Sequence, residues 1–203
     1  MSTTSCQHHD SWNAIFAPAA QSASDSLSRW TNGRIQLELD DVAEIGMEQL
    51  TQFLPVENAP STMVIVGIAG DLGGQLILIF DDSSARTLVQ SLLNRNISAP
   101  EAWGELECSA LRETGNICAS AFLSAIRAFA AQAVLLPNPP TIVRDYVSCV
   151  IEQAVMPQLI ENDALLLCQT RMTCEGQAIE FSSLFVPTPL LVEALRRFIT
   201  TSR

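Results

Sequence analysis

The sequence of 203 residues is poor in positive charge. It has 11 basic against 22 acidic residues, a net charge of −11, which argues against nucleic acid and against an anionic membrane surface as partners. Only 16% of the residues are charged and 48% are hydrophobic, so a sizeable core is available and global disorder is not expected. An acidic chain of this kind suits a partner with a basic face.

Histidine is scarce and the cysteines are dispersed. Both histidines, His8 and His9, lie in residues 1–9, which the sequence predicts to be a disordered tail, so no Ser/His/Asp constellation is expected. Together with Cys6 they are residue types that bind metal ions, but a tail is a poor scaffold for a metal site, and we expect neither a metal nor an organic cofactor. The cysteines form no tight pairs, which favours a reduced, cytoplasmic setting over a disulfide framework; they are Cys6, Cys108, Cys118, Cys149, Cys168 and Cys174.

The sequence also lacks a secretory signal and a convincing membrane span. Its N-terminus has neither the basic nor the apolar region of a signal peptide. The most membrane-like window, residues 117–137, contains Arg127, and a central arginine costs roughly 2.5–3.5 kcal/mol in a bilayer. We therefore interpret this window as part of a buried helix.

Hydrophobic periodicity predicts helices and strands in a regular order. A helix over residues 10–30 carries Pro18, which should kink or break it, and the glycines at 67–74 indicate a hairpin turn, not a nucleotide loop. Asp81 should cap the next helix, and Arg196 and Arg197 should lie in the last turn of the final helix. The remaining predicted elements are strands at 34–39, 63–70, 75–80, 165–173 and 177–187, and helices at 82–93, 107–129, 145–155 and 190–199.

This order contains a repeat. The strand that begins at Gly74 and the strand that begins at Gly176 are each followed by a helix of similar pattern, at an offset of about a hundred residues. The offset predicts two α-β-β-β-α units, at about 10–95 and about 101–203. We expect residues 10–203 to form one α/β (α+β) domain in which the two units share a β-sheet with pseudo-twofold symmetry.

One helix, 107–129, carries a narrow polar stripe on an otherwise apolar surface. Its members recur at steps of three or four and therefore share one face; they are Ser109, Glu113, Asn116, Ser120 and Ser124. A solvated helix face needs no function, and that reading stays open. However, the repeat aligns Glu113 with Ala14 and Asn116 with Ala17, so the fold itself does not require polar residues at these positions.

The string S-x-x-x-E-x-x-N, formed by Ser109, Glu113 and Asn116 and followed by ICASAFLSAI, resembles the signature helix of the CheC/CheX/FliY family of chemotaxis response-regulator phosphatases. The flanking segments GDLGGQLILIFDDSSARTLVQSLL and PPTIVRDYVSCVIEQAV resemble that family as well. The resemblance covers roughly residues 10–199, and in length and two-unit layout it is closest to CheC. Many CheC proteins carry two signatures, whereas Ala14 and Ala17 interrupt the first one here, which implies a single active site.

The resemblance implies a CheY-P-type phosphatase that hydrolyses the aspartyl phosphate of a response regulator. Asn116 would orient the attacking water, because phosphoryl transfer depends mainly on positioning and an amide does not titrate. The resemblance thus implies Glu113 and Asn116 as the catalytic pair, in which Glu113 would also pair with a regulator lysine and dock the helix. Ser109 and Ser120 would contact the partner. Mg²⁺ would belong to the regulator. The alternative is a non-catalytic CheC-like adaptor that binds a response regulator, the flagellar switch or CheD.

Overall fold

The computed structural model describes residues 3–46, 49, 60–70, 72–97, 102–129, 134–151, 153 and 165–201. Its helices are α1 (Thr3–Trp30), α3 (Asp82–Leu93), α4 (Glu105–Phe129) and α6 (Pro189–Thr201). Residues 147–151 are also helical. The strands are β1 (Ile35–Ile45), β2 (Ser61–Ala69), β3 (Gly74–Phe80), β4 (Leu136–Pro137), β5 (Thr141–Asp145), β6 (Leu165–Cys174) and β7 (Gln177–Pro187).

The described strands form one seven-stranded antiparallel sheet in the order β1-β6-β7-β3-β2-β4, with β5 also paired to β2. The first repeat contains β1, β2 and β3, which correspond in that order to β5, β6 and β7 of the second repeat. The order is therefore symmetric about the β3–β7 pair, and the first strand of each repeat pairs with the second strand of the other repeat. This arrangement confirms the predicted mixed α/β domain with a shared sheet.

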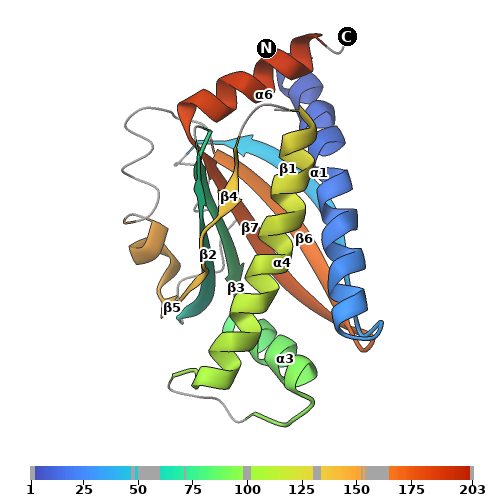
Figure 1. Ribbon diagram of the computed structural model, residues 1–203, viewed down its shortest axis with the longest axis vertical. Coiled ribbons are helices and arrows are strands. Elements are labelled where there is room, and N and C mark those ends of the chain that lie inside the picture. Colours follow the sequence, from blue (N-terminus) through green and yellow to red (C-terminus); the bar gives the residue numbers. More distant parts are fainter. Residues whose placement is uncertain are drawn as a thin grey trace.

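Helices α1 and α4 lie side by side on one face of the sheet, while α3 and α6 lie at its two ends (Figure 1). Beneath this helix pair, Phe122 of α4 stacks on Phe16 of α1 with ring centroids 4.7 Å apart and meets Phe185 of β7 edge-on at 4.7 Å. The opposite face of the sheet has its own buried cluster, which includes Ile77 and Leu184. Helix α4 thus rests on a core that both repeats build.

Local sequence chemistry explains the central elements. Strands β2 and β3 pair directly as the predicted hairpin, from Thr62–Phe80 to Ile68–Gly74. Asp81 caps α3, since its carboxylate accepts a hydrogen bond from the Ser84 N–H at 2.7 Å. None of the described helices is both long and apolar enough to span a membrane.

Helix α1 differs from its prediction at two places. It begins at Thr3, so residues 3–9 are helical where the sequence predicted a disordered tail. It also continues through Pro18 without a break. Proline has no N–H and leaves the carbonyl of residue i−4 without a partner; here that residue is Ala14, which is exposed and open to water.

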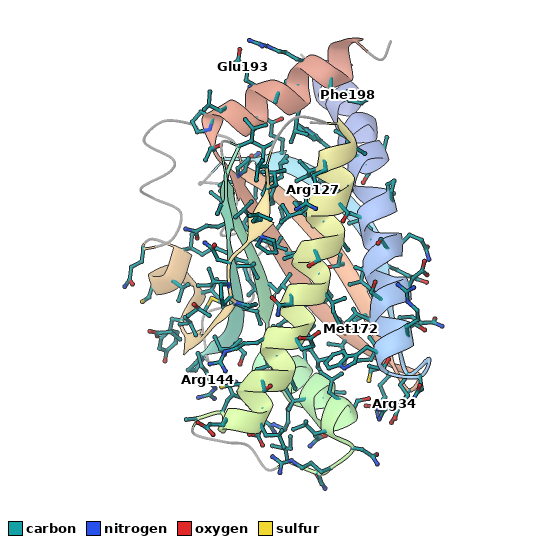
Figure 2. All side chains as sticks on the ribbon, viewed as in Figure 1. Arg34, Arg127, Arg144, Met172, Glu193 and Phe198 are labelled. Carbon is teal, nitrogen blue, oxygen red and sulfur yellow. The ribbon has the colours of Figure 1, made fainter. Side chains whose placement is uncertain are left out.

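Two further differences lie in the second repeat. Strand β5 was not predicted, because Pro139 and Pro140 precede it and its five residues show little alternation. Its pairing with β2 is reinforced by Arg144, which donates to Asp82 at the start of α3 at 2.9 and 3.1 Å (Figure 2). Helix α6 extends to Thr201, so Arg196 and Arg197 lie before its last turn and pair with Glu44 and Glu193 instead.

Candidate functional site

Helices α1 and α4 have similar burial patterns when α4 is aligned 99 positions after α1, although single positions differ, such as exposed Ser22 and buried Ala121. The buried residues of one coincide with buried residues of the other, in the pairs Trp12 and Leu111, Ile15 and Thr114, Phe16 and Gly115, Ala19 and Cys118, Ala23 and Phe122, and Leu27 and Ile126. The exposed faces therefore correspond as well. The register deduced from the sequence, which pairs Glu113 with Ala14, holds in the structure.

The predicted stripe lies on the outer face of α4. Ser109, Glu113, Ser120 and Ser124 are exposed, and Asn116 is half-buried. Among the described residues, none donates to or accepts from the side chains of Ser109, Glu113 or Asn116, whereas the Ser124 hydroxyl donates to the Ser120 carbonyl at 2.8 Å. The carboxylate of Glu113 and the amide of Asn116 are therefore available to a partner.

The N-terminal end of α4 is held by polar contacts. Glu107, which is buried, forms an ion pair with Arg95 from the segment after α3. Just before the helix, the Trp103 indole N–H donates to the Thr62 hydroxyl of β2 at 2.9 Å. These contacts fix the first turns of α4 relative to the sheet, and so position Ser109 and Glu113.

The middle of α4 lies close against the sheet at Gly115. A Cβ atom there would lie 2.5 Å from Cγ1 of Val64 in β2 and 3.5 Å from Pro140. Glycine inside a helix costs roughly 1 kcal/mol relative to alanine, so its presence between Glu113 and Asn116 has a packing reason. Gly115 sets the depth at which Asn116 sits beside the sheet.

The C-terminal half of α4 is held by aromatic packing and one charged hydrogen bond. Besides the contacts of Phe122 with Phe16 and Phe185, the Arg127 guanidinium donates to the carbonyl of Leu135, which precedes β4 (Figure 2). The helix is thus fixed at both ends and in the middle. A rigid element of this kind can hold a positioned side chain, which is what Asn116 would need.

The equivalent face of α1 has no comparable polar groups at the two key positions. Ala14 and Ala17 are both exposed. The nearby Asn13 is turned inward, and its amide donates to Asp41 of β1 at 3.4 Å. In the part of the chain that the structure describes, the full stripe therefore exists on α4 only.

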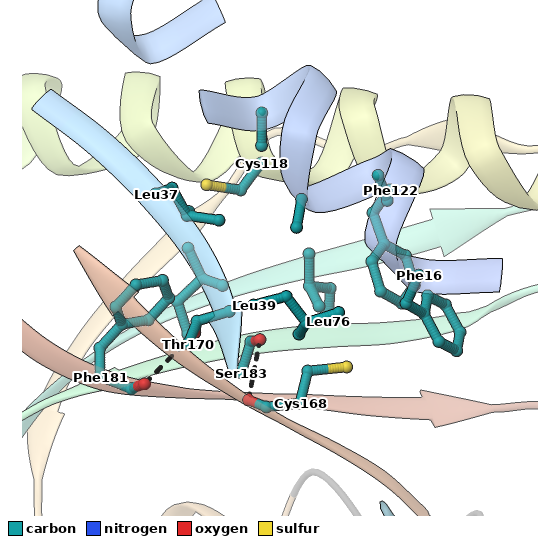
Figure 3. A pocket seen from close by; sticks show the side chains of 14 residues that line it. Phe16, Leu37, Leu39, Leu76, Cys118, Phe122, Cys168, Thr170, Phe181 and Ser183 are labelled. Carbon is teal, nitrogen blue, oxygen red and sulfur yellow. Dashed lines mark hydrogen bonds between the residues drawn. The ribbon is translucent and has the colours of Figure 1, made fainter. Parts of the chain in front are cut away.

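A small cavity of about 40 Å³ lies between the helix pair and the sheet (Figure 3). Its lining is mostly apolar and includes Phe16, Phe122 and the thiols of Cys118 and Cys168. Burial raises the pKa of both thiols to about 12, so neither is a nucleophile at neutral pH. This space is a feature of the core, and its two lining hydroxyls, Thr170 and Ser183, already donate to the carbonyls of Phe181 and Cys168.

Metal binding finds no support in the described residues, which include no group of three or more metal-ligating side chains. The side chains of Cys6, His8 and His9 lie outside the described residues.

Sequence reasoning missed two residues that belong to the site region, Gly115 and Arg112. The signal for Gly115 was present, since a glycine in the middle of a strong helix is unusual.

Comparisons with known proteins find relatives in sequence. The CheY-P phosphatase CheC of Bacillus subtilis is 27% identical over 140 residues, which cover 68% of this chain and 66% of the relative. The CheC1 protein of Halobacterium salinarum is 27% identical over 111 residues, or 55% of this chain and 56% of the relative. The chain therefore spans just under two thirds of the first relative's length and little more than half of the second's. No family model matches.

Three solved structures share the fold. FliY of Thermotoga maritima has a TM-score of 0.74 at 18% identity, with all of both chains covered. The FliG–FliM complex of H. pylori matches at 0.67 and 14%, covering 96% of this chain and 98% of the other. The CheX–CheY–BeF3–Mg²⁺ complex of Borrelia burgdorferi matches at 0.54 and 17%, covering 84% and 96%.

The chain is thus similar in sequence to two CheC proteins and in fold to FliY and CheX. At the identities of the solved structures, the likeness concerns the fold alone. In this chain, α4 has the polar stripe and α1 has Ala14 and Ala17 in its place.

Proposed function

We propose that this protein is a CheY-P-type phosphatase that removes the aspartyl phosphate of a response regulator and acts in the cytoplasm. The observation that carries the proposal is the unpartnered Glu113 and Asn116 pair on the rigid outer face of α4. The relative named CheY-P phosphatase CheC supports the reaction class. The free cysteines among the described residues fit a reducing compartment.

Asn116 is the proposed catalytic residue. Hydrolysis of an aspartyl phosphate needs a water held in line with the phosphorus, and positioning supplies most of the rate in phosphoryl transfer. A half-buried amide on a fixed helix can donate to and accept from such a water without titrating. Gly115 and Phe122 help to hold it there by anchoring α4 to the sheet and to α1.

Glu113, one turn away, is the proposed docking residue. Residues three apart on a helix have their Cβ atoms about 5–6 Å apart, so a lysine that pairs with Glu113 would bring the regulator's phosphate near Asn116. Ser109 and Ser120, exposed on the same face, would contact the partner. Mg²⁺ would come with the regulator, since the solved CheX complex contains CheY, BeF3 and Mg²⁺.

A non-catalytic adaptor is the second candidate. Its support is the fold similarity to FliM, which was solved in complex with FliG, together with the bare Ala14 and Ala17 face of α1. Such an adaptor would bind a regulator, the flagellar switch or, by the family resemblance alone, CheD. A non-catalytic adaptor would not need the side-chain amide of Asn116.

The rate at which the regulator loses its phosphate distinguishes the phosphatase from the adaptor. The measurement is the loss of phosphate from a phosphorylated CheY-like regulator of the same genome, with and without the protein. The phosphatase reading predicts acceleration, and it predicts that Glu113→Gln raises KM for the regulator with little change in kcat, because only docking is weakened. Binding of the regulator without any acceleration would establish the adaptor instead.

A further inference from the structure

Arg112 differs from the other arginines whose side chains the structure describes. Each of those donates a hydrogen bond or forms an ion pair within the chain; they are Arg29, Arg34, Arg86, Arg95, Arg127, Arg144, Arg171, Arg196 and Arg197. Arg112 is exposed and has neither kind of contact with any described residue. In a chain with a net charge of −11, this cation is left for a partner.

The helix itself provides no partner for Arg112. The positions one turn away are Cys108, Ser109, Gly115 and Asn116, and none of them is a carboxylate. Gly115 has no side chain that could cover the guanidinium. Arg112 therefore lies open on the same side of α4 as Asn116, at the border of the polar stripe.

The repeat shows that the fold does not require this arginine. Its counterpart on α1 is Asn13, whose amide is bonded to Asp41 of β1. The same position thus makes an internal contact in the repeat that lacks the stripe. It presents an unpaired cation in the repeat that carries Glu113 and Asn116.

We propose that Arg112 pairs with a carboxylate of the phosphorylated regulator and so helps to fix how the partner docks. The inference rests on the proposed phosphatase function. Glu113 presents a negative charge about 100° further around the helix. A guanidinium beside a carboxylate fits a partner surface that places a carboxylate against the guanidinium and a cation against the carboxylate. This arrangement determines both how the partner is oriented and which partner binds.

The chain contains no lysine, and this allows a direct test. Arg112→Lys introduces the only side-chain amine, which a carbodiimide can join as an amide to a partner carboxylate in contact with it; the reagent takes up the water and leaves as a urea. With the BeF3-activated regulator, we expect a cross-linked peptide that contains position 112. The control Arg29→Lys, at an exposed arginine bonded to Ser26 near the end of α1, should give none at position 29.

Kinetics supply the second readout. Arg112→Ala should raise KM for the phosphorylated regulator by roughly tenfold and leave kcat within about twofold, while Arg112→Lys keeps most of the affinity. An unchanged KM in Arg112→Ala, or no cross-link at position 112, would overturn the inference while the wild type still turns over. If the wild type neither binds nor dephosphorylates the regulator, the proposed function fails first and this inference fails with it.

Discussion

Two exposed carboxylates show how structural and functional groups differ at the scale of single residues. Asp81 accepts hydrogen bonds from the Ser83 hydroxyl and the Ser84 N–H, both at 2.7 Å, and so begins α3. Glu113 accepts none from any described residue. The fold therefore explains the carboxylate of Asp81, whereas the carboxylate of Glu113 is available to a partner.

The capping role of Asp81 predicts a pH-dependent stability. Burial acts to raise the pKa of this carboxyl, but the hydrogen bonds from Ser84 and Ser83 outweigh it and hold the pKa below its ordinary value of 3.8. Its stabilisation is therefore present above pH 3.8 and is lost as the pH falls through the lower folded-state value. Asp81→Ala should reduce the free energy of unfolding by about 1 kcal/mol at pH 7, with a smaller difference near pH 2, measured by urea denaturation.

Asp81→Asn is the matched control, because an asparagine can still cap the helix without titrating. It should retain most of the stability at pH 7. A deficit in Asp81→Ala that stays the same from pH 7 to pH 2 would contradict the assigned role of the carboxylate.

The sequence was sufficient to propose Glu113 and Asn116, because periodicity places them on one face and the repeat aligns them with Ala14 and Ala17. Their role stays a prediction. It was not sufficient for Gly115 or Arg112. The reason for Gly115 is contact with Val64 and Pro140, which are distant in sequence. Arg112 stands out only once the partners of the other arginines are known.

At the scale of elements, the position of α4 depends on its close approach to β2. Alanine normally improves a helix over glycine by roughly 1 kcal/mol. In Gly115→Ala, however, the new Cβ would lie 2.5 Å from Val64 Cγ1, so α4 or β2 must shift. We expect a loss of about 1–3 kcal/mol in the free energy of unfolding, and a lower phosphatase kcat because Asn116 moves with the helix.

The partner substitution provides the control for this prediction. Val64→Ala removes the methyl group that the new Cβ would meet, so the double variant Gly115→Ala/Val64→Ala should be more stable than the sum of the single effects predicts. Chemical denaturation of the four proteins measures this coupling. Strict additivity would show that Gly115 does not set the helix–sheet distance.

Elements were predictable where one segment contains its own signal. The β2–β3 hairpin, the cap of α3 and the body of α4 all follow from local turn, capping and periodicity rules. The passage of α1 through Pro18 and the strand β5 depend on other parts of the chain. Packing of α1 on β1 and α4 holds that helix together, and β5 forms because β2 offers an edge.

At the scale of the whole molecule, the two repeats are interlocked. Strand β1 pairs with β6 of the other repeat, and β5 pairs with β2. Neither repeat can complete its sheet alone. The repeat in the sequence predicted two units on one sheet, but not this exchange, because local patterns do not specify which distant strands pair.

An interlocked core predicts all-or-none protection of its thiols. Cys118 of α4 and Cys168 of β6 are buried with a pKa of about 12, whereas Cys149 is exposed. Since only a thiolate reacts quickly, iodoacetamide at pH 8 should label Cys149 in the native protein. Mass spectrometry should find Cys118 and Cys168 labelled together, and only under conditions that unfold the protein; early labelling of one of them would indicate that the repeats open separately.

The central claim is that one amide on a fixed helix performs the chemistry. The most direct test is the dephosphorylation rate of the regulator with Asn116→Ala, compared with the wild type and with Ser124→Ala as a control on the same face of α4. We predict a loss of roughly 10²-fold for Asn116→Ala, a near-normal rate for Ser124→Ala, and unchanged binding of the BeF3-activated regulator by all three. A wild-type rate from Asn116→Ala would contradict the account.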